Sequence, residues 1–358
     1  MSEPTFLGLD IGGANIKHCS NDGVFGSLPF ELWKHPEKLA AAIADVPGWK
    51  SADHVAITMT GELADCFENK SQGVAAICES VNSAAMNGQT IGYYQTSGKF
   101  VDACEAKASW NLTAASNWHA LASLVGRVLP DCVLIDIGST TTDLIPVCGG
   151  LVTSEGTTDL TRLAAGELLY TGVVRSPVCS VVRFVALDGT HLPIAQELFS
   201  NMLDVYLILG KIKERSNCRH TADGRAANKA HSFKRLARML CADESELNQT
   251  QLVSIAHQIA ERHLSLIKNA ILRIKEREQN GGTFVVTGEG GFVAEAILEK
   301  YARIGTAIGS DAVAKLFDAN SRPAIINTSA AVMFLYRSHV MSGILALPAK
   351  DDKPACNM

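Results

Sequence analysis

One short pattern occurs twice in the chain, and it constrains the fold more than any other feature of the sequence. The segment LGLDIG at residues 7–12 matches VLIDIG at residues 133–138, with an offset of 136 − 10 = 126 residues. Each copy continues into a segment of alternating polar and apolar residues, a glycine turn and a further strand pattern. Because this whole order repeats, and not a tripeptide alone, we interpret the chain as a duplicated domain.

Length and composition agree with two domains. The chain has 358 residues, of which 47% are hydrophobic, and this excludes a disordered polypeptide. A net charge of −5 argues against a general nucleic-acid binder. The first residues lack a basic segment followed by an apolar core, and no apolar run approaches the about 18 residues of a membrane span. We therefore expect a cytoplasmic protein that binds neither nucleic acid nor membrane; a homodimer is possible.

Hydrophobic periodicity predicts strands that alternate with helices. Strands are expected at residues 6–10, 24–30, 54–58, 90–94, 133–138 and 283–287. Helices are expected at residues 36–45, 73–86, 116–128, 193–213, 252–280, 292–303 and 329–339.

The two Asp-Ile-Gly loops are candidates for phosphate and metal binding. Gly12, Gly13 and Gly138 remove side-chain bulk, so backbone N–H groups can approach phosphate oxygens. Asp10 and Asp136 end their strands and can hold Mg²⁺, usually through its waters. The alternative is that these glycines only permit tight turns and the aspartates cap them; two matched loops favour a phosphate cleft. The predicted phosphate-binding residues are Gly12, Gly13, Asn15, Lys17, Gly138, Ser139, Thr140, Thr141 and Arg175.

Three other segments are candidates for nucleotide or substrate binding. In VVTGEGGF (residues 285–292), Gly288 and Gly290 could place a helix N-terminus against an anion, although an ordinary turn explains them equally well. Asn117 stands at a predicted helix start. The basic run at residues 215–238 is typical of a solvated face; the alternative is that Asp223 and Arg225 form a loop that grips an anionic substrate.

These segments together resemble the acetate and sugar kinase/heat-shock chaperone/actin superfamily. GLDIGGANIK, LIDIGSTTTDLIPV and VVTGEGGF are similar to its first phosphate loop, second phosphate loop and adenosine-type loop. Within it the sequence resembles the hydantoinase A/oxoprolinase branch, and specifically the tetrahydromethanopterin-linked C1 transfer pathway proteins. TGELADCFENK, TDLTRLAAGELLYTGVVRSPV and TADGRAANK extend the resemblance, which covers residues from about 5 to 292.

The resemblance implies an α/β fold of duplicated ribonuclease-H-like lobes of the actin and sugar-kinase type, with a cleft between them. Residues 1–130 are then the first lobe and residues 131–327 the second, with a helical insertion at about 190–280. A C-terminal helix at about 328–345 is expected to pack back on the first lobe, and the tail at 348–358 to be disordered.

The resemblance also implies a transferase of methanofuran-type cofactor biosynthesis. Such an enzyme condenses an (aminomethyl)furan-methyl diphosphate with the phenol of γ-glutamyltyramine and releases diphosphate. Mg²⁺ is the expected cofactor, ATP is possible but not favoured, and the expected partners are small molecules bearing phosphate or diphosphate. Glu62 or Asp143 is the expected general base for the phenol. Two alternatives stay open: an ATP-dependent hydrolase of the hydantoinase/oxoprolinase type, and a small-molecule kinase on the same fold.

Overall fold

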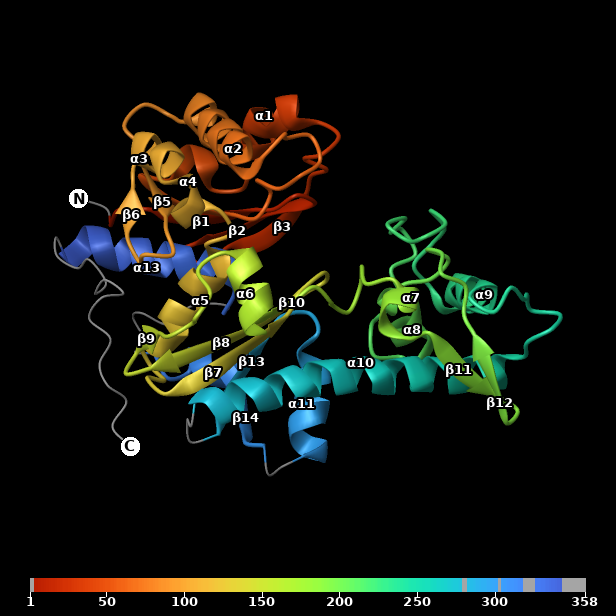
Figure 1. Ribbon diagram of the computed structural model, residues 1–358. Coiled ribbons are helices and arrows are strands. Elements are labelled where there is room, and N and C mark those ends of the chain that lie inside the picture. Colours follow the sequence, from red (N-terminus) through yellow and green to blue (C-terminus); the bar gives the residue numbers. More distant parts are fainter. Residues whose placement is uncertain (1–2, 279–281, 302–303, 318–325, 343–358) are drawn as a thin grey trace.

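Two mixed β-sheets, one in each lobe, organise the chain (Figure 1). The computed structural model describes residues 3–278, 282–301, 304–317 and 326–342. The first sheet has the strand order β3-β2-β1-β4-β5-β6. Its strands are β1 (Phe6–Ile11), β2 (Asn15–Ser20), β3 (Phe25–Pro29), β4 (His54–Met59), β5 (Thr90–Tyr94) and β6 (Phe100–Val101).

The second sheet has the strand order β10-β8-β7-β13-β14, with β9 paired to β8. Its strands are β7 (Cys132–Ile137), β8 (Thr142–Cys148), β9 (Leu151–Val152), β10 (Leu168–Leu169), β13 (Thr283–Thr287) and β14 (Thr306–Gly309). The long separation in sequence between β8 and β13 accommodates an insertion of helices and a small hairpin.

The pairing of the central strands shows the duplication directly. Strand β1 is antiparallel to β2 and parallel to β4, and β7 is likewise antiparallel to β8 and parallel to β13. Across the hairpins, Asp10 lies opposite Lys17 and Asp136 lies opposite Asp143, so both pairs keep the offset of 126 residues. This is the ribonuclease-H-like arrangement, and the predicted α/β fold of duplicated lobes is confirmed.

The helices of the first lobe lie on its sheet, except the last of them, which packs against the C-terminal helix and the second sheet (Figure 1). They are α1 (Leu39–Ala44), α2 (Lys70–Ala84), α3 (Ala103–Ala108), α4 (Trp110–Thr113) and α5 (Asn117–Gly126). A short 3-10 turn, Pro36–Lys38, precedes α1. The C-terminal helix α13 (Thr328–Ser342) lies against β1. The contact is close, because a Cβ atom added at Gly8 would lie 2.1 Å from the carbonyl oxygen of Ser329. The predicted tail at residues 348–358 lies outside the described residues.

The second lobe carries the insertion, which extends to one side along the longest helix, α10 (Figure 1). The helices of the second lobe, the insertion included, are α6 (Asp159–Ala165), α7 (Val178–Val181), α8 (Met202–Ile208), α9 (Lys229–Arg238), α10 (Gln249–Glu278), α11 (Gly291–Lys300) and α12 (Ser310–Ala314). A hairpin of β11 (Phe184–Leu187) and β12 (Thr190–Pro193) completes it.

The helix predicted at residues 193–213 is wrong over most of its length. Pro193 ends β12, and only Met202–Ile208 is helical. The Asp204 carboxylate accepts a hydrogen bond from the N–H of Asn201 at 3.2 Å, which fixes the start of α8. Gly210 has a φ of +68°, and this left-handed conformation stops the helix. Two local signals therefore outweighed the apolar periodicity.

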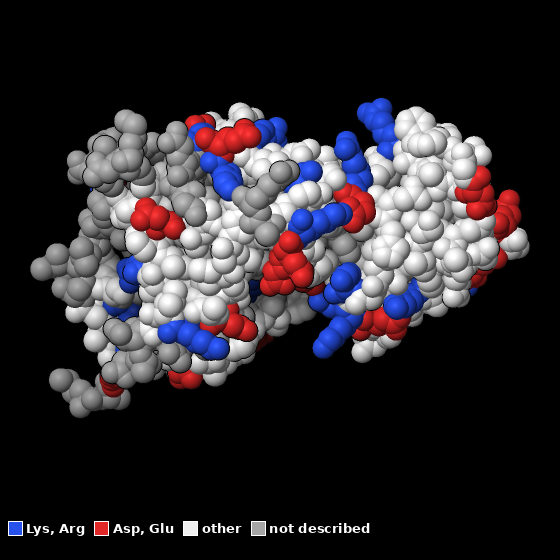
Figure 2. All heavy atoms as spheres, turned by 90° about the horizontal axis from the view of Figure 1, so that it is seen from below, with Lys and Arg blue, Asp and Glu red and all other residues white. Residues whose placement is uncertain are grey.

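The lobes share part of their core. One apolar cluster contains Phe6 and Ala56 from the first sheet, Leu134 and Val285 from the second, and Val332 from α13. None of the described helices combines the length and the apolar character needed to cross a bilayer. Seen from below, acidic and basic side chains are interspersed over the surface (Figure 2).

Candidate active site

The two Asp-Ile-Gly loops adopt the same turn. The N–H of Gly12 donates to the carbonyl of Asn15 at 2.9 Å, and the N–H of Gly138 donates to the carbonyl of Thr141 at 2.8 Å. Both bonds join residues related by the offset of 126, so the duplication extends to individual hydrogen bonds. A Cβ atom added at Gly13 would meet no atom within 4 Å, and this residue therefore borders open space where a ligand could approach.

A following segment supports each loop. The carbonyl of Gly13 accepts from Leu32 N–H at 2.9 Å. The carbonyl of Ser139, its counterpart, accepts from Val174 N–H at 3.1 Å and from Arg175 N–H at 2.9 Å. These bonds hold the carbonyls within the protein, which a loop needs if it is to offer N–H groups to an anion.

Asp10, the acid of the first loop, is buried, with 2% of its surface exposed. One carboxylate oxygen accepts from Lys17 Nζ at 3.2 Å and from the Thr328 hydroxyl at 2.5 Å. The other oxygen, Oδ1, is buried and has no hydrogen-bond partner among the described residues. A buried carboxylate oxygen without a partner is unfavourable, and a cation or a hydrogen-bond donor would satisfy it.

Acids of both lobes act electrostatically on one ammonium group. The pKa of Lys17 is raised chiefly by Asp10, and Asp136 and Asp143 of the second lobe raise it further. Burial raises the pKa of Asp136 to about 6, Asp143 adds to the effect, and Lys17 opposes it. The two loops therefore lie near enough for their charges to act on one another.

The duplicated sites differ in charge at one equivalent position. Lys17 occupies in the first lobe the place that Asp143 occupies in the second. Asp143 is bound by Arg162, whose Nη2 lies 2.8 Å from Oδ1, although burial still raises the pKa of this carboxyl. The Arg162 guanidinium is itself 1% exposed and stacks 3.9 Å from the ring centre of Trp118. Asp143 is therefore engaged, which counts against the prediction that it acts as a free general base.

Glu62 is a buried acid beside the first loop. It is 1% exposed, and its Oε2 has no hydrogen-bond partner among the described residues. Burial raises the pKa of Glu62 to about 7, with Lys70 lowering it and Asp159 raising it. These two neighbours form an ion pair of 2.8 Å that joins α2 of the first lobe to α6 of the second. Such a carboxyl can gain or lose a proton near neutral pH.

The third glycine loop lies against the second. The Thr287 hydroxyl donates to Asp136 at 2.9 Å. Gly288 has a φ of +88°, and a Cβ atom there would lie 2.5 Å from Asp136 Oδ1. At Gly290 a Cβ atom would lie 2.4 Å from Cγ2 of Ile137. Close packing thus explains both glycines, and their predicted contact with a nucleotide stays a prediction.

The remaining predicted residues are placed as follows. Asn117 is the first residue of α5, and Ser139 and Thr140 have their hydroxyls 3.3 Å apart. Arg175 is exposed beside the second loop. Asp223 is held inside the insertion by Arg235, at 2.9 Å, which leaves it poorly disposed to grip a substrate. Arg225, more than half exposed, lies 3.9 Å from Asp223.

Four contributors to the site were missed in the sequence: Lys70, Arg162, Thr287 and Thr328. Thr328 contacts Asp10 across 318 residues of sequence, and Thr287 contacts Asp136 across 151. No local pattern indicates such contacts. Lys70, Arg162 and Thr287 did lie in segments that carry the family resemblance, and this was the signal that could have been followed.

The acidic residues fit a magnesium ion in part. Asp10 has a free buried oxygen, and Asp136 is an acid whose pKa is raised by burial and by a neighbouring acid. Among the described residues no group of three His, Cys, Asp or Glu side chains is arranged to hold a metal. Magnesium commonly binds through one or two carboxylates and completes its shell with water and substrate phosphate. The residues therefore suit an ion that arrives with a phosphorylated ligand.

Comparison with known proteins gives the family. The hydantoinase/oxoprolinase family model matches residues 53–308. The chain belongs to this family. A curated relative from Methanocaldococcus jannaschii, (4-{4-[2-(gamma-L-glutamylamino)ethyl]phenoxymethyl}furan-2-yl)methanamine synthase, is 34% identical over 299 residues, which is 82% of this chain and 89% of the relative. The synthase of the same name from Methanococcus vannielii is 33% identical over 45% of this chain and 71% of its own length. This hydantoinase/oxoprolinase family member is accordingly an enzyme.

The solved structures to which the chain is similar are more distant in sequence. A ROK family glucokinase from Streptomyces griseus, in complex with glucose and AMPPNP, is 12% identical. The comparison covers 93% of this chain and 99% of the glucokinase, with a TM-score of 0.47. Component A of the Acidaminococcus fermentans (R)-2-hydroxyglutaryl-CoA dehydratase is 13% identical over 93% of this chain and 97% of its own, with a TM-score of 0.42.

Proposed function

We propose that the protein is a transferase that joins an (aminomethyl)furan-methyl diphosphate to the phenol of γ-glutamyltyramine and releases diphosphate. Similarity to two synthases whose names describe this ether product supports the proposal. The observation that carries it is the set of acids from both lobes around Lys17, beside two glycine loops. This arrangement suits a substrate with two adjacent phosphate groups and a divalent cation.

The first part of the reaction is departure of the diphosphate. The bond between the furan methylene carbon and the diphosphate oxygen breaks, and the electron pair leaves with the diphosphate. Lys17 and the N–H groups of the two loops would stabilise the charge that develops on that oxygen. Magnesium, held by Asp10 and Asp136, would supply further neutralisation of the phosphates when bound.

The second part is attack by the phenol. Its oxygen forms a bond to the same methylene carbon, and its proton passes to a general base. Glu62 suits this role better than Asp143, because its Oε2 is unpartnered and its pKa is about 7, whereas Asp143 is paired with Arg162. The products are the aryl ether, diphosphate and the protonated base.

Incubation of the purified protein with both substrates and Mg²⁺ tests the proposal. We expect one diphosphate for each ether formed, without ATP. Replacing Lys17 with methionine should lower turnover by about 100-fold, as for removal of a charge-stabilising donor. The matched control is Lys34→Met, because Lys34 contacts only its sequence neighbours Glu31 and Trp33 at the surface in the described structure and should be dispensable. Formation of ADP from ATP without a furan, and no ether product, would instead support the hydrolase or kinase alternatives.

A further inference from the structure

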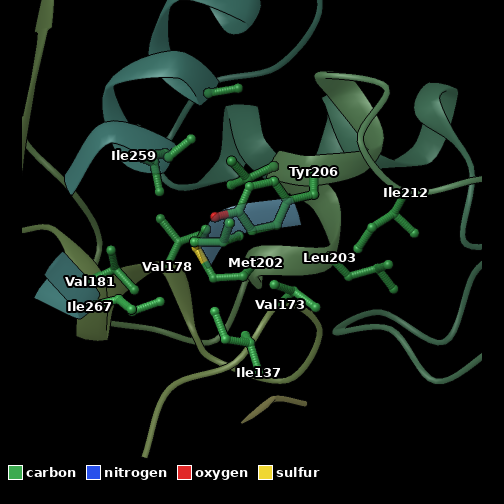
Figure 3. Close-up of a cluster of buried hydrophobic side chains, with 14 of the residues drawn as sticks. Ile137, Val173, Val178, Val181, Met202, Leu203, Tyr206, Ile212, Ile259 and Ile267 are labelled. Atoms are coloured by element: carbon green, nitrogen blue, oxygen red, sulfur yellow. The ribbon is translucent and has the colours of Figure 1, made fainter. Parts of the chain in front are cut away.

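A chain of polar side chains crosses the apolar core of the second lobe. Tyr206 on α8 lies among aliphatic side chains that include Ile259 and Ile267 (Figure 3). Its hydroxyl oxygen is 2.8 Å from Nδ1 of His263 on α10, and Nε2 of this histidine is 2.9 Å from Oγ1 of Thr171. Polar atoms are rarely placed in such a core unless they bond to one another, so the chain requires an explanation.

The direction of each hydrogen bond can be assigned. Burial lowers the pKa of His263 to about 4, so its neutral ring has one donor and one acceptor. The Thr171 hydroxyl donates to Oγ of Ser176 at 3.2 Å, and its oxygen is therefore free to accept from His263 Nε2–H. His263 Nδ1 then accepts from the Tyr206 hydroxyl. The hydrogen bonds therefore run in one direction, from Tyr206 through His263 and Thr171 to Ser176. The Ser176 hydroxyl oxygen also accepts a hydrogen bond from the N–H of Gly172 at 2.8 Å.

The hydrogen-bonded row of Tyr206, His263 and Thr171 ends beside the second phosphate loop. The carbonyl of Thr171 accepts from the Thr142 hydroxyl at 2.8 Å. Next to it, Gly172 packs so closely that a Cβ atom would lie 2.5 Å from the carbonyl oxygen of Gly138. The N–H of Val173 donates to that same carbonyl at 3.1 Å. A displacement of Thr171 would consequently displace the loop at residues 138–142.

We propose that Tyr206, His263 and Thr171 are positioning residues for the second phosphate loop. They fix the loop in the conformation that binds the diphosphate portion of the substrate, and in this respect the inference rests on the proposed function. Arg215 of the insertion also pairs with Glu289 of the third loop. The insertion is thus connected to the loops on two sides, and its helices α8 and α10 support the substrate site from within the core.

The test compares Thr171→Val with Thr171→Ser. Valine keeps the shape and removes the hydroxyl, whereas serine restores it. For T171V we expect the Kd for inorganic diphosphate with Mg²⁺ and the KM for the furan diphosphate each to rise by about tenfold, the usual scale for leaving a buried hydrogen-bonding group unpaired. The KM for γ-glutamyltyramine should not change, and T171S should recover most of the loss.

Tyr206→Phe provides a second variant with a matched control. It should weaken diphosphate binding in the same direction. The control is Tyr94→Phe in the first lobe, because the Tyr94 hydroxyl also contacts a histidine Nδ1, that of His119, at 2.9 Å. Y94F should lower the melting temperature to a similar extent without changing the Kd for diphosphate.

Hydrogen–deuterium exchange without ligand separates this inference from the proposed function. T171V should accelerate exchange in the peptide at residues 138–148, even if the wild-type protein binds no diphosphate and the proposed function fails. Unchanged exchange in that peptide, or unchanged Kd in T171V when the wild type does bind diphosphate, would overturn the positioning role.

Discussion

Replacement of Glu62 with glutamine should alter both stability and activity in a manner that depends on pH. The ordinary pKa of this carboxyl is 4.5, and burial raises it to about 7 in the folded protein. The folded state therefore holds the proton more tightly than the unfolded state does. Stability from this group is fully present below pH 4.5 and is lost as the pH rises through about 7.

The size of the effect follows from the gap between the two pKa values. At about 1.4 kcal/mol for each pKa unit, the ionised carboxylate costs the folded state about 3 kcal/mol at alkaline pH. Glutamine cannot ionise, so E62Q lacks this loss. We expect the unfolding free energy of E62Q, relative to the wild type, to increase by about 2–3 kcal/mol between pH 5 and pH 8.

Urea denaturation at several pH values measures this difference. The control is Glu68→Gln in the same segment, since Glu68 is exposed and its replacement should shift stability by less than about 0.5 kcal/mol at every pH. The kcat/KM of the wild type should rise through about pH 7 as Glu62 ionises, and E62Q should lose that rise with most of the activity. A stability difference between E62Q and wild type that is constant from pH 5 to pH 8 would refute the reasoning.

Four other substitutions test the site. Asp136→Asn should lower turnover by about 100-fold with no loss of melting temperature at pH 8, because the Asp136 carboxylate serves to interact with a charged ligand and does not stabilise the fold. An unfolded variant would contradict this. Gly290→Ala should lower the unfolding free energy measured in urea by about 1–3 kcal/mol, because the added methyl overpacks against Ile137. At Gly138 an added Cβ atom would lie 3.6 Å from its nearest neighbour, the carbonyl oxygen of Thr141. Gly138→Ala should therefore fold normally and weaken diphosphate binding in calorimetry. Arg162→Met should cost about 3–5 kcal/mol of unfolding free energy, because Asp143 is left buried without its partner; a loss below 1 kcal/mol would argue that water reaches this acid.

The duplication could be predicted from the sequence because the repeated motif consists of residues that are adjacent in the chain. A strand that ends in Asp-Ile-Gly places its carboxylate and turn through neighbouring backbone geometry alone, and Asp10 and Asp136 consequently hold equivalent positions in the two sheets. The offset of 126 residues persists even in the turn hydrogen bonds. Signals of this kind need no knowledge of distant contacts.

The parts that could not be predicted depend on such distant contacts. For Gly288 and Gly290 the sequence left an anion contact and an ordinary turn equally open, and the atoms that these glycines accommodate belong to Asp136 and Ile137 on another strand. Asp143 was one of two candidate general bases, and its ion pair with Arg162 follows only from where α6 packs. A residue type indicates which chemistry is available, but the tertiary neighbours decide whether its atoms are already used.

Because α13 packs against β1, the first lobe can complete its folding only after the chain has been synthesised as far as α13. The first sheet emerges from the ribosome early, yet Gly8 packs against Ser329, and Asp10 bonds to Thr328, which is among the last described residues to be made. One apolar face of the nascent first lobe therefore stays uncovered while the entire second lobe is translated. Asp10 gains its contact with Thr328 only when α13 docks, and a truncated chain that ends before Thr328 would present that face to chaperones and proteases.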